Sequence, residues 1–135
     1  IDVAEDSVTS RSRDKRPVNL DISTIKLPLA AITSITHRIS GLILFVGIGI
    51  LLWMLDLSLS GQAGFDRLQD LLTNPLAPSI VWGILAAMAY HMVAGVKHLL
   101  LDIGFGESKE AAPIAATVVI IVSLLLIVIL GVWLW

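Results

Sequence analysis

The stretch ISGLILFVGIGILLWML, residues 39–55, contains no ionisable side chain, and its apolar pattern extends back to Pro28. A helix needs about 20 mostly apolar residues to cross the hydrocarbon core of a bilayer, and the segment from Pro28 onward reaches that length. Two later blocks are equally apolar: residues 71–96, whose ionisable groups are one tyrosine and one histidine, and residues 111–135, which have none. The sequence therefore predicts three transmembrane helices. We expect these spans at about 28–56, 77–103 and 111–135.

The composition supports a membrane protein. Of the 135 residues, 56% are hydrophobic and only 15% are charged, whereas an average soluble domain is about one quarter charged. Short alternating segments, which are typical of a transmembrane β-barrel, do not recur, so we predict an all-α membrane protein. The absence of cysteine excludes disulfides, thiolate metal sites and a cysteine nucleophile. A net charge of −2 without a long basic stripe gives no reason to expect nucleic acid as a partner.

The chain divides into a polar N-terminal segment, residues 1–27, and a single three-helix transmembrane domain, residues 28–135. Between the first two spans, residues 56–74 are typical of a loop that contains a short surface helix, and residues 104–110 predict a tight polar turn before the third span. We expect residues 1–15 to form a solvated tail, with a partner-binding arm as the alternative. The N-terminal segment, residues 1–27, lacks the apolar core of a secretory signal, and its acidic residues are not typical of an intact mitochondrial presequence.

The distribution of basic residues predicts the orientation, because cytoplasmic loops carry the excess of lysine and arginine. Five of the nine basic residues precede the first span, one lies in the first loop, and two lie around the second turn. These are Arg11, Arg13, Lys15, Arg16 and Lys26, then Arg67, then Lys97 and Lys109. The N-terminus is therefore expected on the cytoplasmic side. The four tryptophans fall toward the opposite interface, as an aromatic belt would: Trp53, Trp82, Trp133 and Trp135.

Ionisable residues at membrane depth are the first candidates for function. His91 lies 13 residues after Pro78, roughly 20 Å along a helix, and a neutral imidazole is a common ligand of haem iron. The alternative is a histidine that bonds the backbone of another helix. His98 follows seven residues later on nearly the same helix face, close to the cytoplasmic interface.

The first span carries Ser34, His37, Arg38 and Gly41, whose spacings of three and four place them on one helix face. Such a face can form a pocket in which Ser34 and Arg38 donate hydrogen bonds to an oxygen, while His37 and Arg38 neutralise carboxylates. The alternative is that Arg38 snorkels to lipid phosphates. We place His37 nearer the cytoplasmic end than His91, so a second axial ligand to iron is expected from another chain. Four further polar residues are expected to pack or to bond between helices: Thr33, Thr36, Ser40 and Tyr90.

Three motifs together resemble the cytochrome b subunit of succinate dehydrogenase, the larger membrane anchor of respiratory complex II. They are Arg16-Pro-Val-Asn-Leu-Asp-Ile22, Ser34-x-x-His37-Arg38-x-Ser40-Gly41 and Ala89-Tyr90-His91-x-x-x-Gly95-x-Lys97-His98-x-x-x-Asp102. The resemblance runs from about Arg16 to Gly106. It implies a chain that does not oxidise succinate itself. Electrons would come from FAD and iron–sulfur clusters in a flavoprotein subunit and an iron–sulfur subunit, and would reach ubiquinone beside the membrane anchors.

The resemblance also implies roles for individual residues. Ser34 and Arg38 would line the quinone site, and His91 would be an axial ligand of haem b iron, with the second ligand from the smaller membrane anchor subunit. His37, Arg38 and His98 would lie near the haem propionates. The segment from Arg16 would lie against the iron–sulfur subunit.

Three alternatives differ in function. A fumarate reductase anchor would run the same chemistry in reverse with menaquinone, and a purely structural anchor would use its histidines only to bridge helices. A proton-conducting or transport subunit is disfavoured, because the spans contain no carboxylate at depth that could extend a proton path. We expect a multi-pass protein of the bacterial inner (cytoplasmic) membrane, in contact with the lipid bilayer, rather than a mitochondrial one.

Overall fold

The computed structural model describes residues 18–135, and the regular structure in this part of the chain is entirely helical. The elements are η1 (Ile22–Thr24), α1 (Leu29–Leu59), α2 (Gln62–Thr73), α3 (Leu76–Asp102) and α4 (Ala111–Leu134). Of these, α1, α3 and α4 are long and apolar enough to cross a membrane. The predicted all-α fold with three transmembrane helices is thereby confirmed. The expectations for residues 1–15 lie outside the described residues, and so do Arg16 and Pro17, the first two residues of the motif that ends at Ile22.

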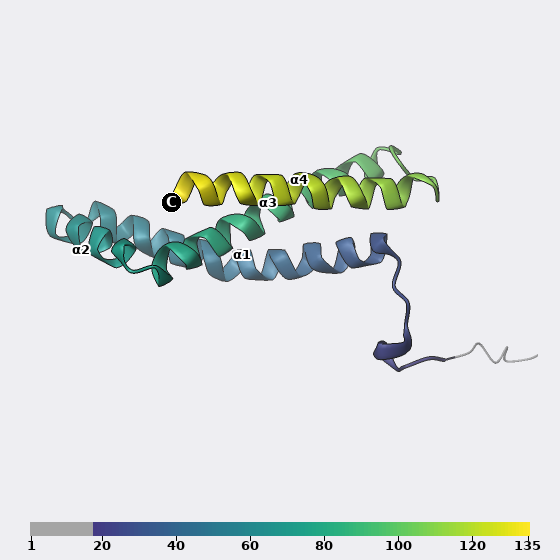
Figure 1. The fold of residues 1–135 in the computed structure, drawn as a ribbon, viewed down its shortest axis with the longest axis horizontal. Coiled ribbons are helices and arrows are strands. Elements are labelled where there is room, and N and C mark those ends of the chain that lie inside the picture. The colour runs from purple at the N-terminus through teal and green to yellow at the C-terminus, as the bar shows by residue number, and fades with distance from the viewer. Residues whose placement is uncertain (1–17) are drawn as a thin grey trace, which may run out of the picture.

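The three long helices alternate in direction (Figure 1). The start of α1, the end of α3 and the start of α4 lie at one end of the bundle, and α2 lies at the other end. Helix α3 packs against both α1 and α4. Because α1 and α3 are antiparallel neighbours, residues early in α1 lie beside residues late in α3, and this pairing builds the site described below.

Proline and glycine set the helix ends. Pro28 adopts an extended conformation before α1, and its carbonyl accepts hydrogen bonds from the backbone N–H groups of the first turn. At the end of α3, Gly104 has a φ of 88°. Its N–H donates to the Leu101 carbonyl, and the Phe105 N–H donates to the Leu100 carbonyl at 2.8 Å. This pattern is a Schellman motif, and it produces the tight turn that returns the chain toward α4.

The buried positions are few and are occupied mainly by small side chains, as expected where lipid is as apolar as the helices and close backbone approach provides the packing. Most large apolar side chains face outward, and Phe45 is 82% exposed. The buried set is Thr33, Ser40, Leu44, Gly47, Pro78, Ile84, Ala89, Ala94, Ala116, Val119 and Ser123. A bundle with this little interior leaves a large apolar surface that can face lipid.

The short elements lie at opposite ends of the bundle (Figure 1). Helix α2 is the short helix expected in the first loop, and it packs against α1 and α3. At the other end, η1 is capped by Asp21, whose carboxylate accepts hydrogen bonds from the Ser23 backbone N–H at 3.0 Å and the Ser23 hydroxyl at 2.6 Å. These two bonds favour the ionised form, so the pKa of the Asp21 carboxyl lies below its usual value.

Candidate functional site

All three histidines of the chain meet between α1 and α3. The rings of His37 and His91 are stacked, with centroids 4.2 Å apart and planes 16° from parallel. The His98 ring lies 5.0 Å from the His37 ring at a tilt of 45°. The fold therefore brings together the three histidines that the sequence analysis proposed as candidate site residues.

The prediction that His37 and His91 lie at clearly different depths is wrong, because the two rings are in direct contact. His37 is eight residues after the start of α1, and His91 is eleven residues before the end of α3. These helix ends lie at the same end of the bundle, so the two positions are roughly 12 and 16 Å from it. The prediction failed because it measured the two depths from opposite membrane faces.

His91 is held by one of its two ring nitrogens. Its Nδ1 lies 3.0 Å from the Ser40 hydroxyl oxygen and 3.1 Å from the His37 carbonyl oxygen. A carbonyl only accepts, so this contact assigns the proton of a neutral ring to Nδ1. The other nitrogen, Nε2, then keeps an in-plane lone pair, and no group within residues 18–135 hydrogen-bonds it. This is the tautomer that an imidazole needs in order to coordinate a metal through Nε2.

Glycines face both stacked rings. An added Cβ at Gly41 would lie 3.0 Å from Cε1 of His91, and one at Gly95 would lie 3.6 Å from Nε2 of His37. Nε2 of His37 is buried and has no hydrogen-bond partner among the described residues. An orphaned buried polar atom costs about 1–3 kcal/mol, so this nitrogen is suited to a polar group on a bound molecule.

These features fit a haem better than a bare metal ion. Within residues 18–135, no group of three or more histidine, cysteine or acidic side chains is placed to hold a metal ion. Haem iron needs only axial ligands from the protein, because the porphyrin supplies the other nitrogens. His91, whose Nε2 is free, meets the requirement for one such ligand, and the glycines let both stacked rings pack close to the helix backbones.

Ser34 and Arg38 lie on α1 with i, i+4 spacing, so they share a helix face. Ser34 is half-buried and Arg38 is exposed. In the part of the chain that the structure describes, neither side chain has a hydrogen bond or an ion pair. Both donors are therefore available to a ligand or a partner subunit at the end of the bundle where α1 begins.

A second set of polar contacts joins α1 to α3. The Tyr90 hydroxyl donates to the Thr33 carbonyl at 3.1 Å and also meets the Thr36 hydroxyl. Nζ of Lys97 lies 3.4 Å from the Thr33 hydroxyl. The interhelical bonding expected for these threonines and Tyr90 is confirmed.

Two contacts of the site were missed by sequence reasoning. Lys97 reaches across to α1, a contact that was not predicted for it. Ser40 was expected to pack or to bond between helices, and its interhelical contact is confirmed, but the partner, His91, was not predicted. The available signal for Ser40 was its position three residues after His37 and directly before a glycine.

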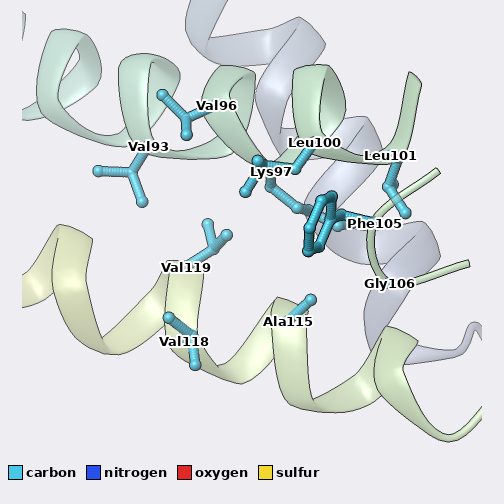
Figure 2. A pocket seen from close by; sticks show the side chains of 10 residues that line it. All are labelled: Val93, Val96, Lys97, Leu100, Leu101, Phe105, Gly106, Ala115, Val118 and Val119. Carbon is cyan, nitrogen blue, oxygen red and sulfur yellow. The ribbon is translucent and has the colours of Figure 1, made fainter. Parts of the chain in front are cut away.

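A cavity lies on the other side of α3 (Figure 2). It measures about 340 Å³ and is lined by residues of α3, α4 and the turn between them. Its walls are aliphatic except for Phe105 and the Lys97 stem, and none of the histidines lines it. The residues are Val93, Val96, Lys97, Leu100, Leu101, Phe105, Gly106, Ala115, Val118 and Val119. The three histidines therefore lie on the side of α3 that faces α1, away from this cavity.

Comparisons with known proteins point to one family. The succinate dehydrogenase/fumarate reductase transmembrane subunit family matches residues 12–130. A succinate dehydrogenase cytochrome b556 subunit of Coxiella burnetii is 41% identical over 122 residues, which cover 90% of this chain and 98% of the relative. Proteins of the same name from Paracoccus denitrificans and Rickettsia felis are 36% and 34% identical over 75% and 88% of this chain, and 78% and 93% of the respective relatives.

Proposed function

The chain belongs to the succinate dehydrogenase/fumarate reductase transmembrane subunit family, and on that premise we propose that it binds haem b through His91 and forms part of a ubiquinone-reduction site with Ser34 and Arg38. In this role it is a membrane subunit of an oxidoreductase complex whose succinate chemistry takes place in other subunits. The observation that carries the proposal is the His91 ring, whose Nδ1 is held by α1 and whose Nε2 is free.

The haem contacts follow from the histidine cluster. His91 would supply a nitrogen ligand to the haem iron, while His37, Arg38 and His98 would provide hydrogen-bond donors or positive charge for the propionate carboxylates. Haem b, when bound, supplies one-electron redox chemistry. The His37 and His91 rings lie face to face, so they cannot approach one iron from opposite sides. This supports a second axial ligand from the smaller membrane anchor subunit.

Ser34 and Arg38 provide donors for a quinone carbonyl oxygen. The guanidinium stays protonated at every relevant pH, and a charge-assisted hydrogen bond strengthens as the oxygen gains negative charge during reduction. No ion pair within residues 18–135 competes for Arg38. The half-buried Ser34 one turn earlier would orient the same oxygen or its neighbour.

The segment before α1 fits a docking role. Residues 18–28 lie at the same end of the bundle as Ser34 and include a capped turn. Three apolar side chains alternate along it and are 78–86% exposed. They are Val18, Leu20 and Ile22. We assign this segment to the surface of the iron–sulfur subunit, which with the flavoprotein subunit would carry the iron–sulfur clusters and FAD.

The same proposal covers organisation and location. Residues 1–27 form the polar N-terminal segment, and residues 28–135 form the transmembrane domain. Three membrane-length helices and bacterial relatives support a multi-pass bacterial membrane protein. We place it in the inner membrane with its N-terminus in the cytoplasm, in agreement with the distribution of basic residues.

The test is a reduced-minus-oxidised optical spectrum of the complex purified through this chain, with succinate as the reductant. We expect a b-type haem signal that succinate generates and that added ubiquinone reverses. Flavin and iron–sulfur subunits without haem would leave a membrane anchor and discard the haem assignment. Reconstitution with ubiquinone or menaquinone then separates this function from a fumarate reductase anchor, because preferred turnover with menaquinol and fumarate would contradict the proposal.

A further inference from the structure

Ser40 is a buried α1 side chain that contacts the proposed haem ligand. We infer that Ser40 is a positioning residue for His91. Together with the His37 carbonyl, it holds the ring in one orientation and one tautomer, and it thereby adjusts how strongly Nε2 donates to iron. This inference rests on the proposed function, because it requires His91 to bind haem.

The direction of the hydrogen bonds follows from the available protons. The Ser40 hydroxyl donates to the His37 carbonyl at 2.6 Å, the shorter of its two contacts. Its single proton is then used, so at 3.0 Å from Nδ1 of His91 the oxygen acts as an acceptor. The carbonyl lies 3.1 Å from the same nitrogen. The Nδ1–H of His91 is therefore shared between two oxygen acceptors of α1.

This sharing has a chemical consequence at the other nitrogen. Hydrogen bonds accepted from the distal N–H of a metal-bound imidazole fix its orientation and raise its basicity. A more basic axial ligand favours ferric over ferrous haem, so each acceptor lowers the reduction potential. Removing the Ser40 oxygen leaves one acceptor, and the potential is expected to rise.

Gly41 provides the space that this arrangement needs. A Cβ at this position would lie 3.0 Å from Cε1 and 3.6 Å from Nδ1 of His91, so the ring rests directly against the α1 backbone. Ser40 and Gly41 thus act on the same edge of the ring, one through a hydrogen bond and the other through the absence of a side chain.

The experiment is a potentiometric titration of haem in the assembled complex, together with the electron paramagnetic resonance spectrum of the ferric form. Ser40→Ala is compared with Ser40→Thr, which keeps the hydroxyl. The matched control is Ser123→Ala, because Ser123 is also buried, at 2% exposed against 5% for Ser40, and its hydroxyl has no partner in the described chain. We expect Ser40→Ala to retain haem and to raise its potential by up to about 59 mV, equivalent to a tenfold weaker preference for the ferric form.

The outcomes separate the inference from the function on which it rests. An unchanged potential and resonance spectrum in an assembled Ser40→Ala complex would overturn it, and so would a loss of assembly that Ser40→Thr fails to restore. A shift in Ser40→Ala with wild-type behaviour of Ser40→Thr and Ser123→Ala supports it. If the wild-type complex lacks haem, or its haem is unaffected by His91→Ala, the proposed function itself fails. If haem responds to His91→Ala but not to Ser40→Ala, only the positioning role fails.

Discussion

The two faces of α3 differ in how they bind their neighbouring helix. Toward α1, Tyr90, His91 and Lys97 all contact oxygen atoms of the neighbouring helix. Toward α4, a single indole contact, from Nε1 of Trp82 to the Ile127 carbonyl at 3.0 Å, accompanies aliphatic packing and an aliphatic cavity. One helix therefore supports two kinds of interface.

The contrast shows how a small membrane subunit separates chemistry from packing. In lipid, a polar group must find a partner inside the protein, so the polar residues of α3 gather on the face where α1 offers carbonyls and hydroxyls. Apolar packing has no comparable directional requirement, and the α4 face needs only small or branched side chains. The following substitutions test whether function is confined to the interface between α1 and α3.

His91→Ala removes the imidazole at the centre of the α1 face. Losing an outer contact to a metal ligand commonly lowers metal affinity 10–100-fold, so losing the ligand itself should lower haem retention by at least about tenfold. The measurement is haem per flavin in the purified complex. Met92→Ala, at the adjacent position that is 63% exposed, serves as the control and should retain haem. Equal haem contents in the two variants would count against ligation by His91.

Arg38→Ala tests the exposed part of α1 near the start of that helix. A hydrogen bond from a charged donor contributes about 1.5–3 kcal/mol, so succinate-dependent quinone reduction should fall roughly 10- to 100-fold. Succinate oxidation with a soluble dye should be retained, because that reaction does not need the quinone site. Arg67→Ala, in α2 at the other end of the bundle, is the matched control. A parallel loss of both activities in Arg38→Ala would indicate an assembly defect.

Gly47→Ala tests the apolar packing between α1 and α3. An added Cβ would lie 2.8 Å from the Ile84 side chain, and overpacking of this kind costs about 1–3 kcal/mol. Gly49→Ala is the control on the same helix, because nothing lies within 4 Å of its added Cβ. The thermal unfolding midpoint in detergent should fall for the first variant only. Equal unfolding midpoints for Gly47→Ala and Gly49→Ala would show that α1 and α3 can move apart near Gly47 without loss of stability.

Tyr90→Phe and Trp82→Phe compare one interhelical donor on each face of α3. Hydrogen bonds between membrane helices contribute about 0.6 kcal/mol on average, so both variants should lose a similar small amount of stability in chemical unfolding. Neither should alter the haem spectrum. A spectral change in Tyr90→Phe would mean that the contacts at Thr33 and Thr36 extend the functional site.

The helices were predictable because hydropathy and length alone identify a spanning segment, and the polar residues of α1 stood out against an apolar background. The stacking of His37 on His91 was not predictable from spacing along one helix, since it depends on which helices are neighbours and on their relative shift. The same reason hid the contact between Ser40 and His91. Serine is common at helix–helix contacts, and only the packed structure shows that this one faces a ring nitrogen.

Because His37 contacts His91 through its backbone carbonyl, substitutions at positions 37 and 40 remove different contacts. Position 37 contributes to His91 through a main-chain atom, which almost every substitution preserves, and it contributes its ring separately. Variants at position 37 therefore report on the ring alone, whereas variants at position 40 report on the support of the central histidine. A saturation screen should thus find both positions tolerant in haem retention, while at position 40 only residues that carry a hydroxyl keep the wild-type haem potential.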